Sequence, residues 1–345
     1  MPITLLPFWR DLKTYNLPSF RADILAAISV ALMALPQAMA YAFVAGLPTS
    51  AGIWAAIFGT IFTASFGESR RLISGPTNMI AILIQSGTSE IIYTYYGRIS
   101  GVELDVIALR VVLQLVLIIG IFQILAGGLR LGRLVQFTSR SVIVGYMAGA
   151  ALAIAVTQLF PFFGIREMDG YHPIYQQGLY LFGYLPTLHL PTTLIAIGCL
   201  ILLIVFYQTS EKVPAAAIMF IIAGGVVWLF NLSPENARGV FDINEGERVE
   251  KVTLLRDVGP IYSDLPKLAP PFFEIRIMTK LIPLAFAITL LSAIEATAIG
   301  RSYTSAREPP YNDNQELYGL GLSNVLSSFL GAMPSSGSFS RSALN

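Results

Sequence analysis

Two charged side chains stand inside apolar runs of the sequence, where charge is costly and therefore a candidate for function. Arg341 lies one turn into the apolar segment that begins at Gly337, and Glu295 is the only acidic residue deep inside a long apolar run. A buried charge costs a membrane helix from about 2.5 kcal/mol upward unless it is paired or hydrated. Because a guanidinium can hold two oxygens of an oxyanion at once, Arg341 indicates an anion site. Alternatively, Arg341 reaches the membrane interface or only neutralises Glu295.

A short motif occurs twice, and it could supply the rest of such a site. Ser74–Thr77 and Ser336–Phe339 each follow a brief extended stretch and open a short apolar helix. A helix that begins in mid-membrane leaves its first N–H groups unpaired and presents a positive dipole end, roughly half a unit charge. Two such ends that face each other would bind an anion without a metal. Gly75 and Gly337 permit tight turns, and Pro76 suits the first helical position.

Polar side chains near these motifs complete the predicted site. Thr77, Ser338 and Ser340 add hydroxyl donors, while Gln37 and Tyr41 lie one turn apart on one face of the first long helix. Each could equally belong to an ordinary helix cap or to the packing of a kinked helix. The predicted substrate-binding residues are Gln37, Tyr41, Gly75, Pro76, Thr77, Gly337, Ser338, Phe339, Ser340 and Arg341, and Glu295 is the predicted coupling residue, which would bind a proton.

The composition identifies the class of protein that must position these residues. Of 345 residues, 54% are hydrophobic and only 12% are charged, and the mean hydropathy is +0.66. This excludes a soluble enzyme, and the net charge of +1 offers no surface for nucleic acid. The scattered His172, His189 and Cys199 do not form a metal site, and we expect no cofactor. An all-α, polytopic membrane protein remains.

Apolar runs of about 20 residues predict the membrane-spanning helices. Two further runs, Pro76–Thr88 and Gly337–Asn345, are short. The long runs are Asp23–Val44, Thr49–Phe66, Val106–Ala126, Ser139–Phe160, Pro191–Tyr207, Val213–Phe230, Thr279–Gly300 and Leu317–Leu330.

The distribution of arginine sets the expected orientation. If the chain starts inside and the run after Pro76 crosses the bilayer, the arginine-rich segments around Arg70 and Arg133 lie on the inner side, as the positive-inside rule requires. Residues 1–22 are then a cytoplasmic segment and 23–345 a membrane domain of a plasma or inner membrane. If the unit that begins with the helix of Glu295 repeats the first unit, the offset is seven helices, and an odd number inverts the second copy.

Four segments resemble the SulP family of sulfate permeases and related anion transporters, in the same order along the chain. They are Leu35–Ala42 with Ala45–Pro48, Arg71–Pro76, Tyr311–Leu317 and Ser336–Ala343. The resemblance implies fourteen membrane segments in two inverted seven-segment repeats, a core domain that moves against a gate domain, and an anion bound between the starts of helices three and ten. It assigns Gln37, Tyr41, Thr77, Ser338, Ser340 and Arg341 to the lining and makes Glu295 the acidic residue of helix eight.

The resemblance also implies features beyond the site. Family members act as proton symporters or anion exchangers, often as homodimers, and many carry a cytoplasmic STAS domain. Since this sequence ends at Asn345, within the tenth segment, we expect four further segments and a STAS domain to be missing from it. Sodium-coupled members carry Asp and hydroxyl residues on helix eight, whereas Glu295 is followed here by Ala296–Gly300, which argues against sodium coupling.

Together these observations predict a secondary active anion transporter that works by alternating access, with sulfate as the first candidate substrate. An anion channel would show conductance without coupled stoichiometry. A nucleobase permease of similar architecture would give no reason for Arg341. A membrane enzyme is the weakest alternative, because the predicted spans hold no nucleophile–base pair.

Overall fold

The chain forms two compact units in a computed structural model. Unit 1 comprises Met1–Val144 and Gly259–Asn345, and unit 2 comprises Gly145–Val258. The structure describes residues 3–12, 15–97, 102–132, 148–149, 152, 155–156, 158–165, 174–209, 215–233, 252, 266, 268, 271, 273–303 and 311–345.

Four helices among the described residues are long and apolar enough to cross a membrane, or five if one sharply bent pair counts as a span. They are α2 (Leu17–Val44), α3 (Thr49–Phe66), α5 (Val102–Gly128) and α12 (Ile275–Tyr303). Helix α3 has the predicted bounds. Helix α2 begins six residues before its predicted start, because Asn16 caps it by accepting the N–H of Ser19 at 2.9 Å.

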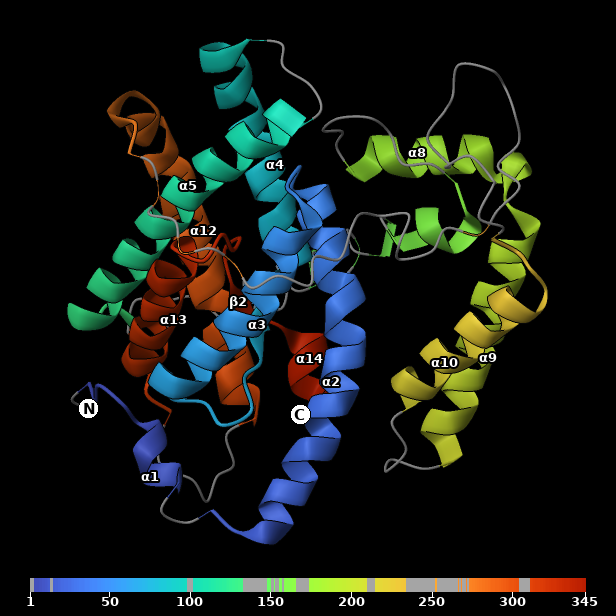
Figure 1. Ribbon diagram of the computed structural model, residues 1–345, viewed down its shortest axis with the longest axis horizontal. Helices are drawn as coiled ribbons and strands as arrows, with labels where there is room; N and C mark the ends of the chain where they lie inside the picture. Colours follow the sequence, from blue (N-terminus) through green and yellow to red (C-terminus); the bar gives the residue numbers. More distant parts are fainter. Residues whose placement is uncertain are drawn as a thin grey trace. The chain divides into compact units, whose positions relative to one another are not determined.

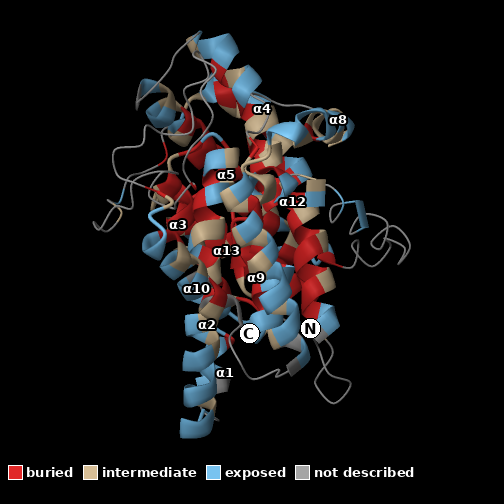
Figure 2. Cartoon of the chain, turned by 90° about the vertical axis from the view of Figure 1, so that its right-hand side faces the viewer, coloured by how far each residue is buried: buried red, intermediate tan, exposed pale blue. Residues whose placement is uncertain are grey.

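Unit 1 also contains α1 (Phe8–Leu12), α4 (Asn78–Tyr96), α13 (Asp313–Ser328) and α14 (Phe339–Leu344), all shown in Figure 1. Helix α13 packs against both α5 and α3. Most residues of α13 are buried, whereas the first turns of α2 are exposed and form the pale-blue lower part of that helix in Figure 2. The apolar core of the unit joins α4, α5 and α12, where residues three or four apart form one buried face.

Two strands that are distant in sequence meet inside unit 1. β1 (Ser74–Gly75) pairs antiparallel with β2 (Ser336–Gly337), so that Ser74 lies opposite Gly337 and Gly75 opposite Ser336. Helix α4 follows β1 and α14 follows β2. The structure therefore places the two repeated motifs side by side.

Two predictions about the helix after β1 are wrong. Pro76 is not its first residue, because Thr77 is the N-cap and α4 begins at Asn78. The helix also runs to Tyr96, well beyond the predicted end at Thr88. The polar residues near that end lower the hydropathy, but Thr88 and Ser89 donate their hydroxyl groups to the carbonyls of Ile84 and Gln85 within the helix.

Unit 2 contains α8 (Ile174–Tyr184), the 3-10 turn η1 (Leu185–Thr187), α9 (Leu190–Thr209) and α10 (Ala215–Leu229). Helices α9 and α10 pack together and correspond to two predicted spans. The bend between α8–η1 and α9 is 111°. Helix α8 was not predicted, since its 11 residues are too few for a span. The predicted span Ser139–Phe160 lies largely outside the described residues.

Candidate functional site

The strand pair is extended by contacts that tie the start of α14 to the segment before β1. The N–H of Ser338 donates to the carbonyl oxygen of Ile73 at 3.0 Å. The N–H of Ile73 in turn donates to Oγ of Ser342 at 2.9 Å. These bonds anchor α14 to the segment that precedes β1.

Arg341 lies where these two segments meet. Its side chain is 1% exposed, and its Nη2 donates to the carbonyl oxygen of Pro76 at 2.9 Å. Its Nε and Nη1 have no hydrogen-bond partner within the part of the chain that the structure describes. The guanidinium is therefore buried in unit 1 and does not extend to its surface.

Gly75 makes room for this guanidinium. A Cβ atom at Gly75 would lie 3.1 Å from Nη2 of Arg341 and 3.3 Å from Cα of Ala56, and the φ angle of +151° disfavours other residues. From the opposite side, Thr60 Oγ1 donates to the carbonyl of Ser74 at 2.7 Å. Hence α3 fixes the backbone against which Arg341 lies.

Other buried polar atoms also lack a partner among the described residues. They include Oε1 of Gln37, Oγ1 of Thr77 and Nδ2 of Asn78. Asn78 is the first residue of α4 and is 5% exposed. The sequence interpretation missed it, although an amide beside the Thr77 hydroxyl at the start of an apolar helix was a usable signal. A buried amide or hydroxyl without a partner is costly, so these atoms are suited to a polar ligand.

The remaining predicted residues occupy α14 and α2. Ser338 caps α14, its Oγ accepting the N–H of Arg341 at 3.5 Å and lying 3.3 Å from Oγ of Ser340. Phe339 and Ser340 are exposed at the start of that helix. Helix α14 contacts α2, beside which it lies in Figure 1. Tyr41 of α2 packs against the main apolar cluster and is also near enough to Arg341 to interact with it electrostatically.

Glu295 joins the site through β2. Its Oε2 accepts the hydroxyl of Ser336 at 2.8 Å, and the residue is 8% exposed. Gly337 packs against the same helix, because a Cβ atom there would lie 3.3 Å from Cα of Ala296. The acidic residue of α12 and the arginine of α14 therefore approach the strand pair from different elements.

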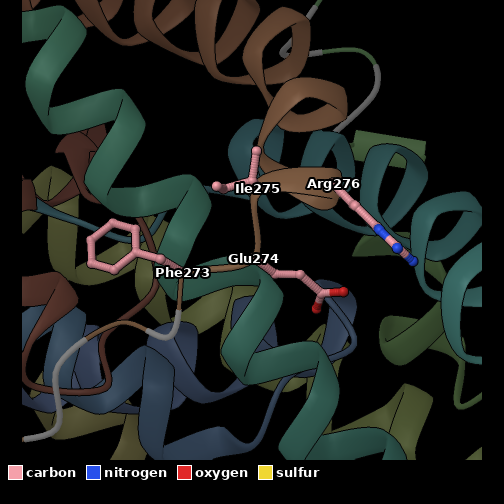
Figure 3. A pocket seen from close by; sticks show the side chains of 4 residues that line it. All are labelled: Phe273, Glu274, Ile275 and Arg276. Carbon is pink, nitrogen blue, oxygen red and sulfur yellow. The ribbon is translucent and has the colours of Figure 1, made fainter.

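A separate surface depression, shown in Figure 3, is lined by Phe273, Glu274, Ile275 and Arg276. The carboxylate that lines this depression, that of Glu274, accepts a hydrogen bond from the hydroxyl of Tyr96 at 2.7 Å. The depression contains none of the predicted site residues. Within the described ranges, no three His, Cys, Asp or Glu side chains gather as metal ligands.

Two opposed helix starts joined by short extended segments in a multi-helix membrane domain are typical of secondary transporters with inverted repeats. The sequence model described as the sulfate permease family matches residues 20–345, so the chain belongs to this family. The resemblance read from the four motifs is confirmed.

Known relatives agree with this membership. The chloroplastic sulfate transporter 4.1 of Arabidopsis thaliana is 30% identical over 351 residues, which cover 99% of this chain and 47% of the relative. The chain spans about half the length of the curated relatives it matches.

Solved structures show the same fold. The inward-facing structure of the murine solute carrier 26 family member A9, an anion transporter, superposes with a TM-score of 0.78 at 19% identity, covering 99% of this chain and 55% of that one. The transmembrane domain of the cyanobacterial bicarbonate transporter BicA gives a TM-score of 0.72 at 22% identity, covering 96% and 77%. The predicted all-helical SulP-type membrane fold is confirmed.

Proposed function

We propose that this chain is the anion-binding part of a secondary active transporter that moves a small oxyanion by alternating access. The observation that carries the proposal is the buried guanidinium of Arg341, with two nitrogens that lack a partner among the described residues, beside the starts of two helices. A buried guanidinium whose Nε and Nη1 lack hydrogen-bond partners is costly, and an anion at this point would supply those partners.

The substrate-binding residues in this proposal are those of α2 and of two arms, which are β1 with the start of α4 and β2 with α14. Arg341 neutralises the anion with the help of the helix dipoles. Thr77, Ser338 and Ser340 donate hydroxyl hydrogen bonds, and the amide of Gln37 orients the ligand. We add Asn78, whose Nδ2 is buried and has no partner in the described structure.

Sulfate is the first candidate substrate, and bicarbonate is the second. The Arabidopsis relative is named a sulfate transporter, and a structural neighbour is named a bicarbonate transporter. A tetrahedral oxyanion can accept hydrogen bonds from both arms and from the fork of Arg341 at the same time.

Glu295 is the proposed proton-binding group. It touches β2 through Ser336, so that a change in its charge acts directly on one arm of the site. We further propose an N-terminus on the cytoplasmic side, a plasma or inner membrane location, and a homodimer. A nucleobase permease is disfavoured, since a neutral heterocycle gives no reason for a buried arginine at the site.

The decisive experiment uses the full-length product of the gene in proteoliposomes with labelled sulfate and an inward proton gradient. We expect gradient-driven uptake in the wild type and its loss in Arg341→Ala. The matched control is Arg276→Ala, which removes an arginine from the surface depression and should leave uptake unchanged. Uptake that persists in Arg341→Ala contradicts the site, and sulfate conductance without proton-driven accumulation favours a channel.

A further inference from the structure

A single carboxamide holds the backbone immediately before β2. Asn324, on α13, is fully buried. Its Oδ1 accepts the N–H of Ser335 at 2.8 Å, and its Nδ2 donates to the carbonyl oxygen of the same residue at 3.1 Å. A neighbouring strand would satisfy a residue in this way, exchanging both bonds with it. The carboxamide of Asn324 therefore satisfies the backbone of Ser335 in the way that an adjacent strand would.

Two further helices fix the orientation of this carboxamide. Nδ2 of Asn324 also donates to Oε1 of Gln123 on α5 at 2.8 Å. Nε2 of Gln123 in turn lies 3.0 Å from Oγ of Ser292 on α12. Since the N–H of Ser335 requires an acceptor, Oδ1 of Asn324 must face it, and Nδ2 must face Gln123. All of these side chains are buried and satisfied, which makes the network rigid.

The segment held by Asn324 carries Arg341 and contacts Glu295. Ser336 follows Ser335 directly and donates to Glu295. Ser338 and Arg341 come next along the chain, and Arg341 reaches across to Pro76. A displacement of Ser335 would therefore move the hydrogen bond to Glu295 and the guanidinium together. The hydroxyl of Ser335 also donates to the carbonyl of Ala55 on α3 at 3.3 Å. β1 is held to α3 by two hydroxyl contacts, from Thr60 to Ser74 and from Ser74 to Gly59.

We infer that Asn324 is a positioning residue of the anion site. Its carboxamide, oriented by Gln123, fixes β2 so that Arg341 is presented to the anion and Ser336 to Glu295. The inference rests on the proposed function, because it concerns the same site. Asn324 does not touch the anion and acts only through the backbone of Ser335.

The test measures sulfate affinity by calorimetry and uptake kinetics in proteoliposomes for three variants of the full-length protein. Asn324→Leu keeps the branched shape of the side chain but removes both bonds to Ser335. Gln123→Met keeps those bonds and removes the acceptor that orients Asn324. The matched control is Ser328→Ala, on the same helix and equally buried, whose hydroxyl donates only to its own helix at Val325.

Asn324→Leu should raise the KM and the Kd for sulfate about tenfold, and Gln123→Met about threefold, with maximal rates changed by less than about twofold. Ser328→Ala should leave all three quantities unchanged. If Asn324→Leu does not fold, Gln123→Met carries the test. In the background of Arg341→Ala, either substitution should cause no further loss of affinity, because the effects of coupled residues are not additive.

Two failures can be told apart. Wild-type protein that binds no sulfate overturns the proposed function. Wild-type protein that binds sulfate while Asn324→Leu and Gln123→Met lower only the melting temperature, with KM and Kd unchanged, overturns the positioning role. Full additivity with Arg341→Ala would also overturn it.

Discussion

Individual residues of the site are defined by polar atoms that the described part of the protein leaves without a partner. Arg341 has a buried guanidinium of which one nitrogen is bonded to Pro76, and Gln37 and Thr77 each bury an oxygen without a partner. Such atoms cost the folded protein about 1–3 kcal/mol each. A bound anion would offset part of this cost, because it can accept hydrogen bonds from Arg341 and Thr77.

The contact of Gly75 with Arg341 gives a prediction at this scale. Gly75→Ala should weaken sulfate binding about tenfold, since the new methyl group meets the guanidinium and the φ angle strains the backbone by about 1–3 kcal/mol. Gly97→Ala is the matched control, because Gly97 also has a positive φ, +76°, but open space around it. Isothermal titration calorimetry on both variants separates the effect of the methyl contact with Arg341 from the effect of a strained φ angle. Equal affinities in the two variants would show that the contact with Arg341 is irrelevant.

At the scale of elements, two acidic side chains tie the start of α13 to other parts of unit 1. Asp313 and Glu316 lie in its first turn, where Glu316 accepts the N–H groups of Glu68 and Ser69 at 3.0 and 2.9 Å and Asp313 pairs with Arg301. Both side chains therefore hold neighbouring segments in place. From the sequence, an acidic residue at a helix start indicates only a favourable interaction with the helix dipole, because partners such as Glu68 and Arg301 are distant along the chain.

The close approach of α13 to α5 gives a second prediction. A Cβ atom at Gly321 would lie 2.6 Å from the backbone N of Ile124 and 2.8 Å from the carbonyl oxygen of Gly120. Gly321→Ala should therefore destabilise the protein by about 1–3 kcal/mol through overpacking. Gly224→Ala, on α10 with open space, should cost nothing. Thermal unfolding in detergent measures both, and an unchanged melting temperature for Gly321→Ala would mean that the helices pack less closely.

Some parts of the site were predictable from the sequence and others were not, for physical reasons. The Ser–Gly motifs repeat in sequence, so the facing starts of α4 and α14 were predictable, and Arg341 was visible as a charge in an apolar run. Asn324 and Gln123 gave no such signal, because a buried amide is meaningful only through partners from other helices. Asn78 was overlooked beside the more familiar hydroxyl of Thr77.

At the scale of the whole molecule, the membrane domain belongs to the sulfate permease family. The proposed coupling of proton binding at Glu295 to anion transport can be tested. Glu295→Gln keeps an acceptor for Ser336 and removes the titratable group. We expect proton-driven sulfate accumulation to be lost and sulfate–sulfate exchange to continue. Glu90→Gln, on the exposed face of α4, is the matched control and should retain both activities. Accumulation retained in Glu295→Gln would exclude Glu295 as the proton-binding group.

The most direct measurement is equilibrium binding of sulfate to this chain in lipid nanodiscs by isothermal titration calorimetry, with uracil as the neutral heterocycle for comparison. Wild-type protein should bind sulfate and not uracil. Arg341→Ala should lower the affinity for sulfate about 10- to 100-fold, as expected for the loss of charge-assisted hydrogen bonds. Binding of sulfate with equal affinity by wild type and Arg341→Ala, or binding of uracil in place of sulfate, would contradict an anion site at the meeting point of β1 and β2.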